Sequence, residues 1–124
     1  MFFQDKSFRV MEAGMNAAWL QQQVHTHNIS NYDTPTYKAK SLVFSEVITQ
    51  SRTRGAEGKR LTSSALKVTL VEDDTTTIRP DGNNVDMDIE SLSLYKSYVH
   101  YSMLLDKLKS EINNHNYVIN NGPR

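Results

Sequence analysis

Two pairs of histidines are the first candidates for chemistry, because imidazole is a common metal ligand. His25 and His27 are two residues apart, a spacing that places them about 200° apart around a helix. Side chains that point in nearly opposite directions cannot hold one ion. His100 and His115 show no ligand spacing with each other. We therefore expect all four to be solvated or hydrogen-bonded, with no metal bound.

An acidic run at residues 81–90 (DGNNVDMDIE) offers the oxygen ligands that calcium prefers. It lacks the glycine at position six and the glutamate at position twelve that an EF-hand loop requires. Acidic residues at and just after a helix N-cap are stabilised by the helix dipole. The run therefore predicts the start of a helix, capped by Asn84 or Asp86.

No enzyme signature stands out among the other polar residues. The chain contains no cysteine, which excludes a thiolate zinc site, a cysteine nucleophile and a disulfide. It contains no G-x-S-x-G motif, no P-loop and no G-x-G-x-x-G motif. Its 14 basic and 14 acidic residues cancel, which argues against sequence-independent binding of nucleic acid. We expect no catalysis, no cofactor and no nucleic-acid partner.

The elements that position these residues fall into three parts. Residues 1–31 carry apolar side chains at helical spacing and end at a helix-breaking stretch before Pro35. Residues 32–84 form a turn motif, a mobile loop and a short β segment. Residues 85–124 form a second helix with a frayed tail from Asn113. We therefore predict a mainly α fold, an antiparallel, coiled-coil-like pair of long N- and C-terminal helices with a small irregular or β middle segment.

The middle part is the least determined by its pattern. Residues 61–71 alternate and are rich in β-branched side chains, as is typical of a strand. Residues 75–78 could add a second short strand. Residues 37–47 fit either a strand or a short helix. The polar, glycine-containing residues 50–60 predict a loop.

The predicted C-terminal helix carries two apolar stripes with a 4-3-4-3-4 spacing. The first, expected to form the seam with the N-terminal helix, contains Leu94, Tyr98, Tyr101, Leu105, Leu108 and Ile112. The second is offset by about 200°, is interrupted by a lysine, and contains Val85, Ile89, Leu92, Val99 and Met103. The N-terminal helix shows a weaker pair of stripes, Phe8, Met11, Met15 and Ala18 against Ala13, Ala17, Leu20 and Val24.

A two-helix hairpin buries only one stripe of each helix. The other stripes are covered either by the middle part of the chain or by other molecules. The middle part has few large apolar residues to spare, so we expect the second stripe to face neighbouring subunits. No apolar run is long enough to span a membrane.

The segment that closes the first helix, residues 28–38 (NISNYDTPTYK), closely resembles the motif N-I-A-N-x-x-T-P-G-Y-K of the bacterial flagellar rod and hook proteins. The matching residues are Asn28, Ile29, Asn31, Thr34, Pro35, Tyr37 and Lys38. Ser30 replaces an alanine, and Thr36 replaces the usual glycine. Because threonine is strained where φ is positive, we expect another turn geometry here or a slightly altered chain direction after Pro35.

A second string, residues 79–86 (RPDGNNVD), resembles the R-x-D-G-N-x-V-D of the same family before its C-terminal helix. The residues that carry the match are Asp81, Gly82, Asn83, Val85 and Asp86. The resemblance covers roughly residues 5–50 and 78–112. The short chain is most similar to the proximal-rod members, which lack large inserted domains.

The resemblance implies a structural subunit of the proximal rod that polymerises through helix packing into the drive shaft and export conduit. It implies self-association and contact with other rod proteins, the adaptor FliE, the MS-ring protein FliF and the export gate. It also implies uncleaved export by the flagellar type III apparatus, and a place in the extracytoplasmic, periplasmic part of the basal body. The alternatives are another axial rod protein, or a cytoplasmic helical adaptor or secretion chaperone.

Overall fold

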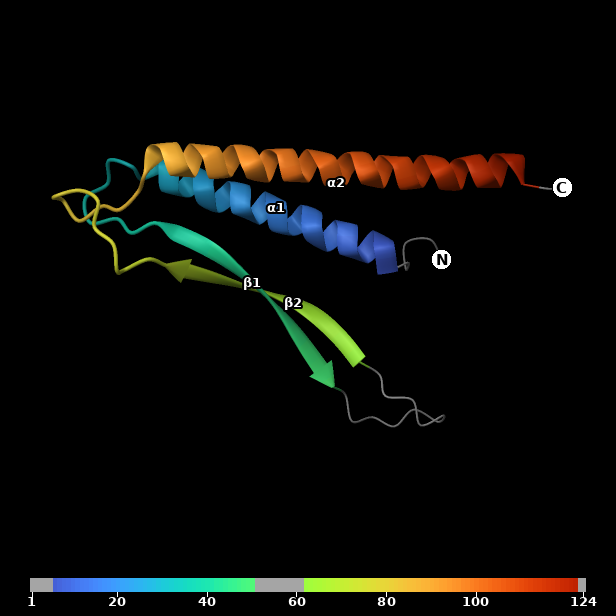
Figure 1. The fold of residues 1–124 in the computed structure, drawn as a ribbon, viewed down its shortest axis with the longest axis horizontal. Helices are drawn as coiled ribbons and strands as arrows, with labels where there is room; N and C mark the ends of the chain where they lie inside the picture. The colour runs from blue at the N-terminus through green and yellow to red at the C-terminus, as the bar shows by residue number, and fades with distance from the viewer. Residues whose placement is uncertain (1–5, 51–61, 123–124) are drawn as a thin grey trace.

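The computed structural model describes residues 6–50 and 62–122. Along the chain, helix α1 (Lys6–Ser30) is followed by strands β1 (Lys40–Gln50) and β2 (Thr62–Glu72) and by helix α2 (Met87–Asn121). Figure 1 shows α1 and α2 side by side and antiparallel, with the two-stranded hairpin diverging from α1. The predicted mainly α fold with a small β middle segment is therefore confirmed. Within the described residues, neither α1 nor α2 contains an apolar stretch of the length that a membrane span needs.

Small side chains allow α1 and α2 to approach each other closely. Met11 and Ala18 of α1 are buried, and so is Ser97 of α2. A Cβ atom placed on Gly14 would lie 3.1 Å from Cδ1 of Leu104, so the α1 backbone lies directly against an α2 side chain. The helix pair is held by close approach rather than by many large buried side chains.

Two polar contacts cross the helix pair nearer its closed end. Gln22 Nε2 donates to the Ser97 carbonyl oxygen at 3.4 Å. His25 Nδ1 and Glu90 Oε2 are 2.7 Å apart and partly shielded from solvent. Such directional contacts help to fix the register of the two helices.

Helix α2 begins as predicted and ends later than predicted. The Asp86 carboxylate accepts hydrogen bonds from the backbone N–H groups of Asp88 (3.0 Å) and Ile89 (3.1 Å), so Asp86 is the N-cap. The prediction that the tail frays from Asn113 is wrong, because the helix continues to Asn121. The sequence from residue 87 to 121 contains neither proline nor glycine to interrupt the helical hydrogen bonds.

The middle part forms one antiparallel hairpin. β1 pairs with β2 so that Lys40 lies opposite Glu72 and Phe44 opposite Val68. The strand expected at residues 61–71 is confirmed. Residues 37–47, which fitted either a strand or a short helix, form a strand from Lys40 onward. The loop expected at residues 50–60 lies outside the described residues, apart from Gln50 at the end of β1.

The second short strand expected at residues 75–78 is wrong. The Asp73 carboxylate accepts hydrogen bonds from Thr75 N (3.0 Å), Thr75 Oγ1 (2.7 Å) and Thr76 Oγ1 (2.7 Å). An aspartate that binds the backbone two residues on makes a turn instead of a strand. An open hollow lies between the hairpin and α1, and Val24 and Leu70 both line it.

Candidate functional site

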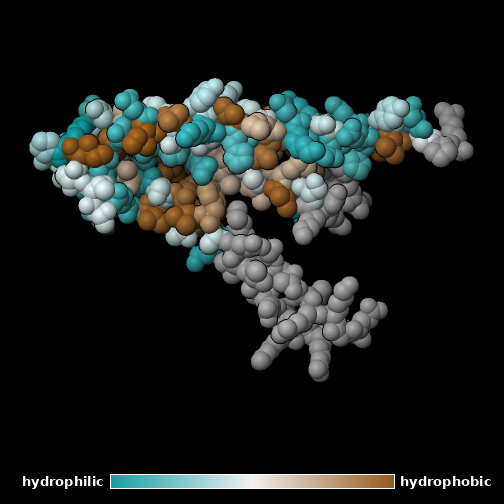
Figure 2. Space-filling view, viewed as in Figure 1, coloured by the Kyte–Doolittle hydropathy of each residue, from teal (hydrophilic) through white to brown (hydrophobic). Residues whose placement is uncertain are grey.

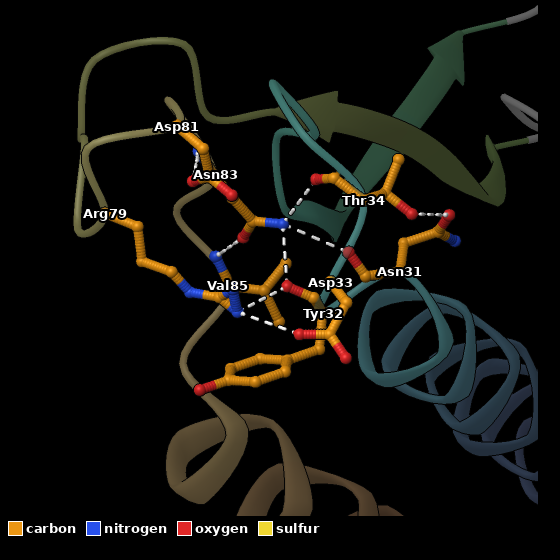
Figure 3. Close-up of polar contacts among 8 residues, drawn as sticks. All are labelled: Asn31, Tyr32, Asp33, Thr34, Arg79, Asp81, Asn83 and Val85. Atoms are coloured by element: carbon orange, nitrogen blue, oxygen red, sulfur yellow. Dashed lines mark hydrogen bonds and ion pairs between the residues drawn. The ribbon is translucent and has the colours of Figure 1, made fainter.

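The two sequence motifs meet where α1 ends and α2 begins, and Asn83 joins them. Its side chain is fully buried, at 0% exposed. Nδ2 donates to the carbonyl oxygens of Asn31 (3.1 Å), Tyr32 (3.0 Å) and Thr34 (2.8 Å). Oδ1 accepts from the backbone N–H of Val85 at 2.7 Å. We call this cluster, residues 31–34 together with 79–85, the Asn83 junction (Figure 3).

Arg79 closes the junction from the side. Its Nη2 atom donates to the Tyr32 carbonyl oxygen at 2.6 Å, and its guanidinium carbon lies 3.9 Å from the centroid of the Tyr32 ring. A weaker contact reaches Asp33 at 3.5 Å. Figure 3 shows this side chain spanning the two motif segments. Arg79 opens the second motif, but its contact with Tyr32, 47 residues earlier, was not predicted from the sequence.

The turn at residues 79–82 places two left-handed residues against each other. Gly82 has φ +85° and donates its N–H to the Arg79 carbonyl oxygen at 3.0 Å. Thr36 has φ +62° and donates its N–H to the Asp81 carbonyl oxygen at 3.1 Å. Thr36 therefore itself adopts the left-handed conformation at the family's glycine position, so the other turn geometry expected here is wrong. The altered chain direction after Pro35 stays a prediction. The bond to Asp81 helps to hold the strained threonine in place.

Asn28 fixes the start of the hairpin on the end of α1. It is fully buried, and it pairs with both backbone groups of Lys40: Nδ2 donates to the carbonyl oxygen at 2.8 Å, and Oδ1 accepts from the N–H at 3.0 Å. Oδ1 also accepts from the Tyr37 hydroxyl at 3.1 Å. The same hydroxyl lies 2.9 Å from His27 Nδ1, and the imidazole tautomer decides which of these two atoms carries the shared hydrogen.

The environment of Tyr37 disfavours its ionised form. Burial raises the pKa of the Tyr37 hydroxyl above its ordinary value, and the carboxylates of Glu72 and Glu90 raise it further. The neutral hydroxyl can therefore keep donating to Asn28.

The remaining residues of the first motif stabilise its turn. Asn31 Nδ2 donates to the His27 carbonyl oxygen at 2.8 Å, and Thr34 Oγ1 donates to Asn31 Oδ1 at 3.1 Å. Lys38 Nζ donates to the Thr76 carbonyl oxygen at 2.8 Å. Ile29 is half-buried and Pro35 is exposed.

Asn84 does not cap α2 and instead ties the two ends of the hairpin together. Oδ1 accepts from the Ala39 N–H at 2.6 Å, while Nδ2 donates to the Asp73 carbonyl oxygen (2.8 Å) and to Thr76 Oγ1 (3.0 Å). The neighbouring asparagines thus have separate roles: Asn83 joins the ends of the two helices, and Asn84 joins the ends of the two strands. The role of Asn84 was not predicted from the sequence, because only long-range contacts distinguish the two amides.

Two residues of the predicted stripes lie elsewhere. Val85 is only 1% exposed, because it precedes the helix and sits in the Asn83 junction, so helical spacing does not apply to it. Tyr98, expected in the seam, is 60% exposed. Positions spaced at a strict heptad shift gradually around a straight helix of 3.6 residues per turn. At the level of Tyr98 on α2, the neighbouring Ser97 therefore faces α1.

The other seam residues differ in burial along the helix. Leu94, Tyr101, Leu105 and Leu108 are half-buried, and Ile112 is exposed near the end of the pair. The remaining members of the second stripe are between 36% and 65% exposed, and we call them the outer stripe: Ile89, Leu92, Val99 and Met103. Figure 2 shows hydrophobic side chains interrupting the polar surface along α2. This apolar surface has no cover within the described part of the chain.

Comparison with known proteins finds relatives of a single kind. No family model matches the chain. The chain is 29% identical over 118 residues to the flagellar basal body rod protein FlgB of Bacillus subtilis, covering 90% of this chain and 92% of the relative. It is 25% identical over 132 residues to FlgB of Escherichia coli K12 (95% and 96%) and 26% identical over 124 residues to FlgB of Salmonella typhimurium (87% and 88%).

Two terminal helices, interlocked by the two motifs, are thus found in a chain related to the flagellar rod proteins. Eight curated relatives match, and each of them carries the name FlgB. The resemblance of this chain to the flagellar basal body rod protein FlgB is therefore confirmed.

Proposed function

We propose that this chain is a structural subunit of the proximal rod of the bacterial flagellar basal body. The observation that carries the proposal is the similarity to FlgB along about nine tenths of the chain. The role requires polymerisation through helix packing, which yields a stiff drive shaft around an export conduit. The two terminal helices supply the inner layer, and the strands β1 and β2 lie further out.

The outer stripe supports a role in assembly rather than in catalysis. Its four apolar side chains lie along one helix and are each exposed to solvent by 36% or more. An exposed apolar surface of this kind usually marks a protein interface. Full burial of such a side chain contributes about 1.5–3 kcal/mol, whereas an exposed ion pair contributes about 0–1 kcal/mol. Helix packing therefore drives the assembly, and the chain carries no enzyme activity.

The partners of the proposed subunit are further copies of itself, other rod proteins, the adaptor FliE, the MS-ring protein FliF and the export gate. The subunit reaches the periplasmic part of the basal body uncleaved, through the flagellar type III apparatus. The two motifs serve this role by fixing the direction in which the hairpin leaves the helix pair, through the contacts of Asn28 and Asn84.

Electron microscopy of basal bodies from a strain that lacks this chain tests the proposal. We expect membrane rings without a rod or hook, and restoration of both by the parent gene. Complete rods and hooks in the deletion strain would overturn the proposal and favour a cytoplasmic adaptor or secretion chaperone. Fractionation of the native cells then distinguishes the two classes, since a rod subunit co-purifies with basal bodies.

A further inference from the structure

We propose that two copies of this chain associate by seating the outer stripe of one copy in a groove beside the helix pair of the next. The groove, called here the side groove, is lined by the apolar or aromatic side chains of Phe8, Met15, Trp19, Tyr101 and Leu108 and by the polar side chains of Glu12 and Asn16. This inference rests on the proposed function and adds to it the two surfaces through which copies meet.

The side groove has the size and lining to accept side chains from a helix. It is an open groove of about 480 Å³ between α1 and α2. Trp19 is 52% exposed beside it, and aromatic side chains such as Trp and Tyr contribute strongly at interfaces. None of the outer-stripe residues lines the groove, so the two surfaces are separate and both are available in one copy.

Charge complementarity identifies the occupant as a second copy. Glu12 is the single charged residue in the lining of the side groove. Lys96 is the single charged residue that interrupts the outer stripe, between Leu92 and Val99. Both side chains are exposed, and neither forms an ion pair with another residue in the described part of the chain. An apolar ridge with one cation matches an apolar groove with one carboxylate.

The two surfaces differ, so the contact between copies is heterologous. In an open row of copies, a heterologous contact leaves the side groove empty at one end and the outer stripe uncovered at the other end. Such contacts generate closed rings or open helical filaments. They do not stop at a two-fold dimer, and this is the behaviour that a rod subunit needs.

A single contact of this size is expected to be weak. A stable interface buries at least about 1,000 Å² in total, and one helical ridge in one groove supplies only part of that area. The contact therefore gains strength from several neighbours in a polymer. In dilute solution the copies associate only transiently, so trapping methods are the appropriate test.

Cysteine trapping tests the geometry directly, because the chain has no cysteine of its own. We make Glu12→Cys and Lys96→Cys in separate full-length chains and mix them under mild oxidation. The expected result is a disulfide-linked pair in the mixture, with at least about tenfold less self-linking of either variant alone. Ser91→Cys, an exposed position of α2 outside the outer stripe, replaces Lys96→Cys as the matched control.

Charge reversal tests the role of the ion pair independently of crosslinking. Glu12→Lys alone and Lys96→Glu alone are each expected to weaken association by about tenfold or more, because like charges then meet. The double variant Glu12→Lys with Lys96→Glu restores it. Circular dichroism verifies that each variant keeps the parent's helix content, as expected for exposed positions.

Three results would overturn the inference: no linked pair in the cysteine mixture, equal linking by the Ser91→Cys control, or a double variant as defective as the single ones. These outcomes are separate from failure of the proposed function, which is detected in basal bodies of the deletion strain. A strain that needs this chain for its rod, together with absent trapping, refutes the docking surfaces alone.

Discussion

Asn83 Nδ2 donates a 2.8 Å hydrogen bond to the carbonyl oxygen of Thr34, a residue 49 positions earlier in the chain. This contact joins the turn that ends α1 to the turn that begins α2. Two further carbonyl groups share the same amide. The direction of both helices at the closed end of the pair therefore depends on one buried carboxamide.

Replacing this carboxamide with a carboxylate is predicted to destabilise the fold. In Asn83→Asp, an oxygen takes the place of the donor and faces three carbonyl oxygens without a proton to share. We expect the free energy of unfolding to fall by about 2–4 kcal/mol. The midpoint of thermal unfolding, followed by circular dichroism, measures this loss.

Asn114→Asp is the matched control, because Asn114 is exposed on α2. Its effect should stay within about 0.5 kcal/mol. Equal unfolding midpoints for Asn83→Asp and Asn114→Asp would show that the Asn83 junction contributes little to stability.

Thr36 is a site where a substitution should stabilise the protein. Its φ of +62° costs a residue with a Cβ atom roughly 1–2 kcal/mol, and glycine removes that cost. Glycine also increases the entropy of the unfolded chain, and this effect offsets roughly 0.5–1 kcal/mol of that gain in stability. Thr36→Gly is therefore predicted to raise the free energy of unfolding by up to about 1 kcal/mol, measured by urea denaturation.

Thr77→Gly provides the comparison for Thr36→Gly. Thr77 is exposed and has no positive φ, so glycine there only adds entropy to the unfolded chain and should lower stability. If both glycine variants are destabilised alike, Thr36 does not hold the strained conformation in solution.

The turn after β2 gives the fold a dependence on acid. Hydrogen bonds from Thr76 and Thr75 lower the pKa of the Asp73 carboxyl from 3.8 to about 2. Because the folded-state pKa is lower, the carboxylate stabilises the fold above about pH 4, and this contribution is lost as the pH falls toward 2. Carbon-13 NMR of the Asp73 carboxyl should show a titration midpoint near 2.

Thr76→Val removes the first of these donors and should move the Asp73 midpoint upward, toward its ordinary value. Asp73→Asn should remove this part of the acid dependence of unfolding. A midpoint of Asp73 at 3.8 in the parent chain would contradict the hydrogen-bonded turn.

Local patterns predicted most of the fold. The apolar periodicity of both helices, the alternation at residues 61–71 and the acidic start of α2 each arise from nearby residues, so the sequence alone predicts them. The hairpin needed more than local pattern. Residues 40–47 form a strand because Asn28 and β2 supply partners for their backbone groups.

The tasks of individual side chains at the site were harder to predict. Asn83, Asn84 and Arg79 contact residues far away in sequence, and no spacing rule connects such pairs. Val85 shows the limit of stripe counting, since a periodic position just outside a helix has a different environment. The motif resemblance identified Asn28 and Asn83 as important, and the structure explains both as buried amides that replace backbone partners.

The most direct test of the assembly account is complementation of the deletion strain with a variant of the outer stripe. Val99→Asp places a charge at the centre of this stripe without touching the Asn83 junction, and Ser91→Asp places the same charge on α2 outside it. Rods are counted in basal bodies by electron microscopy. We expect no rods with Val99→Asp and normal rods with Ser91→Asp. Normal rods with Val99→Asp would contradict this expectation.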